Sequence, residues 1–126
     1  MTMIARVGEP EMTGLGPAAA LFHGLADPTR LVILRHLRGG EHKVRELTDH
    51  LGLAQSTVSA HLSCLRDCGL VVSRPVGRAS MFTLAEADGL ESVLVAAESL
   101  LASTGRTVAL GAHHWHETHD SAAGTP

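Results

Sequence analysis

Residues 54–69 read AQSTVSAHLSCLRDCG, and this stretch decides the fold that we predict. Val58, Leu62 and Leu65 recur at the spacing of one buried face of an α-helix. The residues off this face are small and uncharged, and they are Gln55, Ser56, Ser59 and Ser63. Most solvated helix faces carry Lys and Glu, whereas small amide and hydroxyl groups suit close approach to base edges and phosphates in a DNA major groove. We therefore predict a DNA recognition helix.

Two further helices are predicted upstream. Residues 44–50 form a short amphipathic helix that closes at Gly52, and only Leu53 and Ala54 separate it from the recognition helix. Two short helices joined by such a turn form a helix-turn-helix. Before them, Asp27 is placed to cap a helix that has Pro28 at its first position and ends at Gly39.

Residues 70–74 and 79–84 predict two strands joined by a turn at 75–77, which is the wing of a winged helix-turn-helix. Arg74 and Arg78 flank its tip and suit phosphates or a narrow minor groove. Residues 88–104 predict a helix with more apolar surface than so small a domain needs. We assign it, with the apolar residues 18–25, to a dimer interface.

The predicted fold is mainly α with a small β-hairpin, in the order α-α-α-α-β-β-α, and it is dimeric through its first and last helices. We expect a flexible arm at 1–17, one domain at 18–104 and a flexible His-rich tail at 105–126. No apolar run approaches the ~20 residues that cross a bilayer, and the N-terminus carries no evident secretion signal. We therefore expect a cytoplasmic location and no membrane partner.

The charge is unevenly distributed along the chain. The net charge is −3, but residues 27–84 carry eight Lys and Arg against five acids, a net charge of +3, and the remainder carries −6. The positive charge thus lies around the predicted reading helix, which weakly favours binding to nucleic acid.

Cys64 and Cys68 are the only two cysteines, and they lie one turn apart on the recognition helix. Three interpretations remain open: small buried hydrophobes, a redox pair or metal ligands. A disulfide needs Cβ atoms about 3.5–4.5 Å apart, whereas one helical turn separates them by about 5–6 Å. Two sulfurs converge on a metal across that gap without distorting the helix. They would select Cd²⁺, Pb²⁺, Zn²⁺ or Cu⁺ over Mg²⁺ or Ca²⁺.

Four histidines fall within residues 113–119, and this cluster is also open to more than one interpretation. It is a solvated tail, a separate nickel or zinc site, or the source of the ligands that complete the thiol site. In the last case the histidines could come from the same subunit or from its partner. The candidate ligands from this cluster are His113, His114 and His116.

The segments LADPTRLVILRHL (25–37), VRELTDHLGLAQSTVSAHLSCLRDCGLV (44–71) and GRASMFTL (77–84) together resemble the ArsR/SmtB family of winged helix-turn-helix repressors. Residues 61–71, HLSCLRDCGLV, are similar to the branch that senses cadmium and lead through a Cys-x-x-x-Cys on the recognition helix. The resemblance implies a homodimeric repressor, with no enzymatic activity, that sits on a two-fold-symmetric operator and is released by a toxic metal. Cadmium or lead is the favoured effector and zinc the alternative.

The chain departs from the family pattern in four places. The Ser that caps the recognition helix is Ala54 here, the arsenic-type Cys-x-Cys is absent at 43–47, and no third cysteine is present. The zinc or nickel site of the last helix is degenerate, with Glu86, Asp88 and Ser99 at the aligned places.

We predict that one recognition helix per subunit enters the major groove of double-stranded operator DNA. The predicted DNA-contacting residues are Gln55, Ser56, Thr57, Ser59, His61, Arg74 and Arg78. The role of His61 follows from the family resemblance alone. The alternatives are a redox-responsive repressor of the same fold, a nickel or zinc sensor that uses the tail histidines, and a winged helix without DNA affinity. An enzyme is not expected, because neither cysteine lies in a phosphate-cradling loop at a helix N-terminus, and no organic small-molecule substrate is expected.

Overall fold

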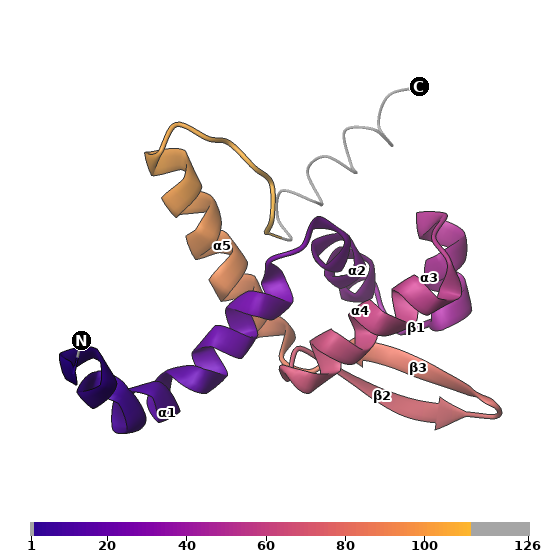
Figure 1. Ribbon diagram of the computed structural model, residues 1–126. Helices are drawn as coiled ribbons and strands as arrows, with labels where there is room; N and C mark the ends of the chain where they lie inside the picture. The colour runs from indigo at the N-terminus through magenta and orange to yellow at the C-terminus, as the bar shows by residue number, and fades with distance from the viewer. Residues whose placement is uncertain (1, 112–126) are drawn as a thin grey trace. The chain divides into compact units, whose positions relative to one another are not determined.

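The computed structural model describes the backbone of residues 2–111 and the side chains of residues 14–111. The elements follow one another as α1 (Thr2–Leu25), α2 (Pro28–Arg38), β1 (His42–Lys43), α3 (Val44–Leu51), α4 (Gln55–Asp67), β2 (Val71–Val76), β3 (Ala79–Leu84) and α5 (Ala87–Ser103) (Figure 1). The chain is mainly helical with one small antiparallel sheet, so the predicted winged helix-turn-helix is confirmed. Within the described residues, no helix is long and apolar enough to cross a bilayer.

The chain divides into two compact units, Met1–Ala85 and Glu86–Pro126. The first unit contains α1 to α4 and the sheet. In the second unit, the carboxylate of Glu98 on α5 accepts hydrogen bonds from the backbone N–H groups of Leu110 and Gly111. Leu90 and Leu94, two members of the apolar stripe predicted for α5, are buried. The assignment of this stripe to a dimer interface stays a prediction.

The core of the first unit is aliphatic and is centred on the buried face of α4. Val58, Leu62 and Leu65 are at most 1% exposed, as the helical spacing predicts. Burying aliphatic side chains of this size stabilises the fold by about 1.5–3 kcal/mol each. The other nearly inaccessible core side chains of this unit come from α2, α3 and β2, and they are Ile33, Leu34, Leu37, Leu47 and Val71.

The ends of the helices follow the local sequence signals. The Asp27 carboxylate accepts a hydrogen bond from the backbone N–H of Arg30 at 3.1 Å and so caps α2, with Pro28 at the first helical position. α3 ends at Gly52, where φ is 67°, a conformation that favours glycine. At the start of α4, Ala54 provides no side-chain cap, as expected.

The sheet has one strand more than predicted. The two-residue strand β1 pairs with β3, with His42 opposite Phe82 and Lys43 opposite Met81, so that β3 is central (Figure 1). Residues 42–43 are too short to show an alternating pattern, which is why the sequence does not reveal this strand. Its pairing anchors the wing to the segment that leads directly into α3.

The first helix is longer than predicted. The sequence predicts an apolar helical segment from Ala18 and a flexible arm at 1–17, but the backbone is helical from Thr2. Extending an existing helix costs little compared with nucleating one, so the helix propagates beyond its apolar segment. Residues 14–20 are all exposed, and Leu15 and Phe22 retain 60% and 63% of their accessible surface. The described part of this helix therefore presents apolar surface to solvent.

Three histidines from consecutive elements cluster where α2, β1 and α3 meet. The ring centroids of His36, His42 and His50 lie 5.2 to 6.3 Å apart. Partial burial lowers the pKa of His36, and the positive charges that His50, His42 and Arg35 can carry lower it further. The folded protein therefore favours the neutral form of the His36 imidazole.

Acid should destabilise the fold through His36. The unfolded chain protonates this residue near the ordinary histidine pKa of 6.5, whereas the folded chain does so only at lower pH. The unfolded state then binds more protons, so the free energy of unfolding should fall as the pH drops through about 6.5 and below. Urea denaturation at a series of pH values should show a weaker pH dependence for His36→Gln. An identical dependence in the variant would contradict this assignment.

Candidate functional site

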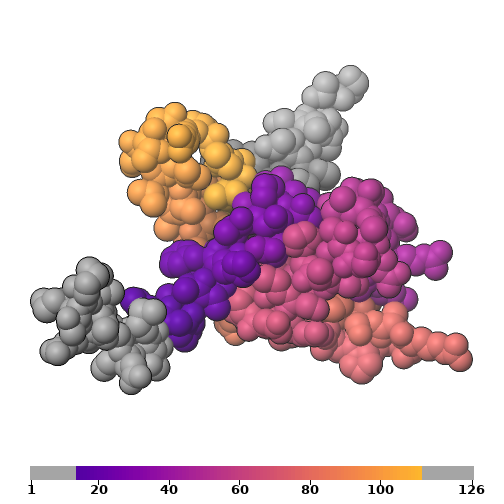
Figure 2. Space-filling model, viewed as in Figure 1, coloured from indigo at the N-terminus to yellow at the C-terminus, as the bar shows by residue number. Residues whose placement is uncertain are grey.

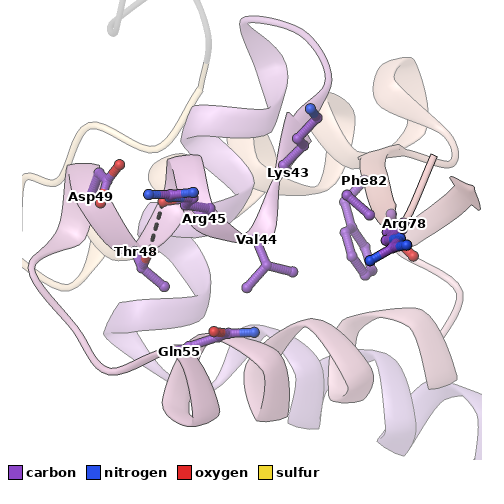
Figure 3. A pocket seen from close by; sticks show the side chains of 10 residues that line it. Lys43, Val44, Arg45, Thr48, Asp49, Gln55, Arg78 and Phe82 are labelled. Carbon is purple, nitrogen blue, oxygen red and sulfur yellow. Dashed lines mark hydrogen bonds between the residues drawn. The ribbon is translucent and has the colours of Figure 1, made fainter. Parts of the chain in front are cut away.

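A groove lies between the start of α3, the first turn of α4 and the wing (Figure 3). Its volume is about 770 Å³. The cationic side chains on its walls are Lys43, Arg45 and Arg78, and Gln55 faces the same space from α4 (Figure 3). The remaining lining residues are Val44, Thr48, Asp49, Ala79, Ser80 and Phe82. We call this feature the basic groove.

The first turn of α4 is accessible beside this groove. Gln55, Ser56 and Thr57 are exposed, and Ser59 is half-buried. The backbone N–H groups at a helix N-terminus are unpaired and carry partial positive charge, which favours an approaching phosphate. Three of the polar residues predicted to face DNA, Gln55, Ser56 and Thr57, therefore lie where the helix is accessible.

His61 lies further along α4, and its role as a DNA contact stays a prediction. Its Nδ1 lies 3.2 Å from a guanidinium nitrogen of Arg30, and its Nε2 lies 3.9 Å from Asp27 Oδ2. Arg cannot accept a hydrogen bond, so Nδ1 of His61 must be the acceptor. The side chain is 18% exposed and packs against the start of α2. His61 thus links α4 to the start of α2.

The two wing arginines are not equivalent. Arg74 donates two hydrogen bonds of 2.8 Å to the two carboxylate oxygens of Glu41. This pairing lowers the pKa of Glu41 and raises the pKa of Arg74. Arg78 instead lies in the turn between β2 and β3 and lines the basic groove. In Figure 2 the wing projects from the first unit as a narrow extension. Only Arg78 of this pair reaches the groove.

Two of the cationic residues in the groove, Lys43 and Arg45, were not predicted from the sequence. A signal was available, because both lie at the start of α3, where acidic residues are favoured by the helix dipole. Lys43 is the N-cap residue, and Glu46 accepts a hydrogen bond from its backbone N–H at 2.8 Å. Two cations at this end of a helix are better explained by an anionic partner than by helix stability.

Cys64 and Cys68 are free thiols that face one cavity. Cys68 is the C-cap of α4, and its backbone N–H donates to the carbonyl of Cys64 at 3.1 Å, so one helical turn separates them. Both are half-buried. The cavity has a volume of about 480 Å³ and is lined from α1 by Ala19, Ala20 and His23, and from α4 by Cys64, Asp67 and Cys68. We call it the thiol cavity.

The Cys68 sulfur is packed against α1. Its S–H donates to the carbonyl of Leu65 at 3.4 Å, and burial raises the pKa of the thiol. A Cβ placed on Gly24 would lie 2.5 Å from Cys68 Sγ and 3.5 Å from the Leu70 side chain. An alanine at this position would force the Cys68 side chain or one of the two helices to shift.

Arg30 holds the same junction together. Its Nε donates to the carbonyl of Gly24 at 2.9 Å, and one terminal nitrogen donates to the carbonyl of His23 at 2.7 Å. The other terminal nitrogen donates to His61 on α4. One guanidinium on α2 thus binds the C-terminal end of α1 and the middle of α4.

The donors around the thiol cavity fit a soft or borderline metal ion. Two sulfurs, an imidazole and a carboxylate match the ligands of Cd²⁺, Pb²⁺ or Zn²⁺. Among residues 14–111 no three His, Cys, Asp or Glu side chains already converge on one point. The other candidate ligands, His113, His114 and His116, lie outside the described residues.

Comparison with known proteins gives matches to bacterial transcriptional regulators. Residues 27–73 match the family model described as bacterial regulatory protein, arsR family. The chain is 52% identical over 68 residues to the HTH-type transcriptional regulator CmtR of Mycobacterium bovis, which covers 54% of this chain and 58% of that protein. It is 40% identical over 78 residues to a probable mercury resistance operon repressor of Streptomyces lividans, 62% of each chain. The matches thus span about three fifths of these relatives.

The fold is also similar to that of a solved structure. This is the solution structure of a homodimeric winged helix-turn-helix DNA-binding domain from Mycobacterium bovis, described as a possible ArsR-family transcriptional regulator. The TM-score is 0.63 at 29% identity, over 76% of this chain and 87% of that chain.

The contact between Gly24 and Cys68 can be measured with a double-mutant cycle. Gly24→Ala should destabilise the protein by about 1–3 kcal/mol, because the added methyl group overpacks the junction. The higher helix propensity of alanine should offset about 1 kcal/mol of this loss. In a Cys68→Ala background the clash is removed while the propensity gain remains. Urea denaturation of the four proteins should therefore give a coupling free energy of about 0.5–3 kcal/mol. Additive effects would show that the two residues are not in contact.

Proposed function

Because this chain belongs to the ArsR family of bacterial regulatory proteins, we propose that it is a transcriptional repressor released from its operator by a soft metal ion. In this proposal the protein binds double-stranded DNA as a homodimer, and Cys64 and Cys68 are the metal ligands. The relatives described above are transcriptional regulators and not enzymes.

The observation that carries the DNA-binding part is the basic groove next to the exposed first turn of α4. Three cationic side chains, Lys43, Arg45 and Arg78, surround Gln55 there. Cations on the rim of a reading helix suit the phosphates on either side of a major groove, while an amide suits the edge of a base. Gln55, Ser56 and Thr57 would then read bases, with Ser59 nearby.

Homodimer formation is supported by the apolar surface that the chain leaves exposed. Phe22 on α1 and Leu100 on α5 are 63% and 69% exposed. Large exposed apolar side chains on two helices are typical of a subunit interface. The solved relative is described as homodimeric. A dimer would present two α4 helices to successive major grooves, with half-site centres about one helical turn apart.

The two wing arginines should contribute differently to DNA affinity. Arg78→Ala should weaken binding to any duplex and lower the slope of log K against log salt by about 1, because it removes one phosphate contact. Arg74→Ala should have the smaller effect, since Arg74 is already paired with Glu41. Fluorescence anisotropy with a labelled duplex over a range of salt concentrations measures both. Equal losses would count against the groove as the DNA-binding surface.

The metal-responsive part is supported by the two thiols in one cavity. Two thiolates favour soft ions, and one relative is described as a probable mercury resistance operon repressor. Cd²⁺ and Pb²⁺ are the favoured effectors, with Zn²⁺ and Hg²⁺ as alternatives. A metal drives release only if it binds the free protein more tightly than the DNA-bound protein. The thiols lie at the far end of the helix whose first turn is proposed to touch DNA. Because the helix is rigid, a displacement of its thiol-bearing end would also move its first turn.

Cadmium should reduce the affinity for operator DNA by about 5- to 150-fold, the usual range of such coupling. The experiment titrates Cd²⁺ into a complex of the full chain with a labelled operator duplex. Cys64→Ser/Cys68→Ser should still bind the duplex but should no longer respond to Cd²⁺. If Cd²⁺ binds and the DNA affinity is unchanged, the proposed metal response is wrong. The proposed DNA-binding function is not affected by that result.

The redox alternative is weaker on the observations above. A disulfide needs Cβ atoms about 3.5–4.5 Å apart, whereas one helical turn places those of Cys64 and Cys68 about 5–6 Å apart. Reversal by dithiothreitol in the absence of metal would distinguish this alternative. A nickel or zinc sensor that uses His113, His114 and His116 would instead keep its response in the double Cys variant.

A further inference from the structure

We propose that His23 of α1 supplies the imidazole ligand to the metal at Cys64 and Cys68, so that the ion joins α1 to α4. This inference rests on the proposed function, because it assigns a further ligand to the same metal. The tail histidines are the competing source of that ligand.

The thiol cavity has walls from two helices of one unit, with Ala19, Ala20 and His23 on α1 and Cys64, Asp67 and Cys68 on α4. Positions 19, 20 and 23 share one helical face, as do 64, 67 and 68. The small alanines leave space between the walls, and His23 is the imidazole in the lining. The cavity therefore has a histidine on the wall opposite the two cysteines.

The backbone of His23 is anchored beside the thiol pair. Its carbonyl accepts the 2.7 Å hydrogen bond from Arg30, and a Cβ on the adjacent Gly24 would meet Cys68 Sγ at 2.5 Å. The residue itself is exposed. Since the donors do not converge among the described residues, binding requires rotation about the side-chain bonds of His23 and the cysteines.

The cavity offers two donors besides the sulfurs, and they differ in chemistry. Asp67 supplies carboxylate oxygen, a hard ligand that suits Mg²⁺ or Ca²⁺ better than Cd²⁺. Neutral imidazole is a common partner of thiolates around zinc and cadmium-like ions. His23 is therefore the better match to a site that already contains two sulfurs.

A metal bound in this way would connect the thiols to the subunit interface. α1 carries exposed apolar surface at Phe22, one residue before the proposed ligand. An ion held by His23 and the two cysteines would tie this helix to the recognition helix. The metal would then change the orientation of α4 relative to the dimer interface, and not only the end of α4.

The test uses the full chain, Cd²⁺ alone and no DNA. Four proteins are titrated while ultraviolet absorption records the sulfur-to-cadmium charge-transfer band: wild type, His23→Gln, His50→Gln and Cys64→Ser/Cys68→Ser. His50, an exposed histidine on α3, is the matched control. A fifth protein, His113→Gln/His114→Gln/His116→Gln, tests the tail. Circular dichroism verifies that each variant is folded.

The expected result is a Cd²⁺ affinity at least about tenfold weaker in His23→Gln, with the charge-transfer band per bound ion retained. His50→Gln and the tail variant should match wild type. Wild-type affinity in His23→Gln, or a loss confined to the tail variant, would overturn the assignment of His23 and leave the thiol site intact. Absence of the band in wild type would instead overturn the proposed metal site itself.

Discussion

The arrangement of the helices depends on the hydrogen bonds that the guanidinium of Arg30 makes. It donates to the carbonyls of His23 and Gly24 at the end of α1 and to the imidazole of His61 on α4. The C-terminal carbonyls of a helix lack intrahelical partners and carry partial negative charge, so a fixed cation is the group best suited to bind them. Asp27, which caps α2, lies near the same imidazole. The three helices are therefore held by one polar cluster at the edge of the aliphatic core.

This cluster determines what surrounds the thiols. Because Arg30 holds Gly24 in place, the Cys68 sulfur can lie against the glycine Cα with no intervening side chain. The same approach creates the thiol cavity beside it. The close contact between Gly24 and Cys68 and the thiol cavity thus both lie at the junction of α1 with α4. A ligand bound in the cavity would act on the position of α1 relative to α4, where the packing leaves little freedom.

The recognition helix is divided along its length. Its first turn is exposed and borders the basic groove, whereas its last turn carries the two cysteines and faces α1. Its buried face is occupied throughout by Val58, Leu62 and Leu65. The exposed first turn and the last turn that carries the thiols are therefore joined through one buried face. The net charge of −3 does not oppose DNA binding, because three of the ten Lys and Arg residues line the basic groove beside this element.

The sequence by itself determined the elements and their order. The stripe of α4, the cap at Asp27, the glycine at the end of α3 and the hairpin all depend on neighbours within a turn or two, so their signals are local. It also identified Cys64 and Cys68 as a pair, because one helical turn separates them. The two-residue strand β1 and the helical extension before Ala18 carried no such pattern.

Only the tertiary structure decided which side chains meet across the helices. His61 is bound by Arg30, 31 positions away, and Arg74 is bound by Glu41, 33 positions away. Arg74 was predicted to face DNA from its place beside the wing tip, and His61 from the family resemblance. Neither signal indicates the partner of the side chain. The juxtaposition of His23 with the cysteines likewise follows from the packing of α1 on α4. Periodicity specifies which face of a helix is buried, but the partners of its polar groups depend on contacts between segments distant in sequence.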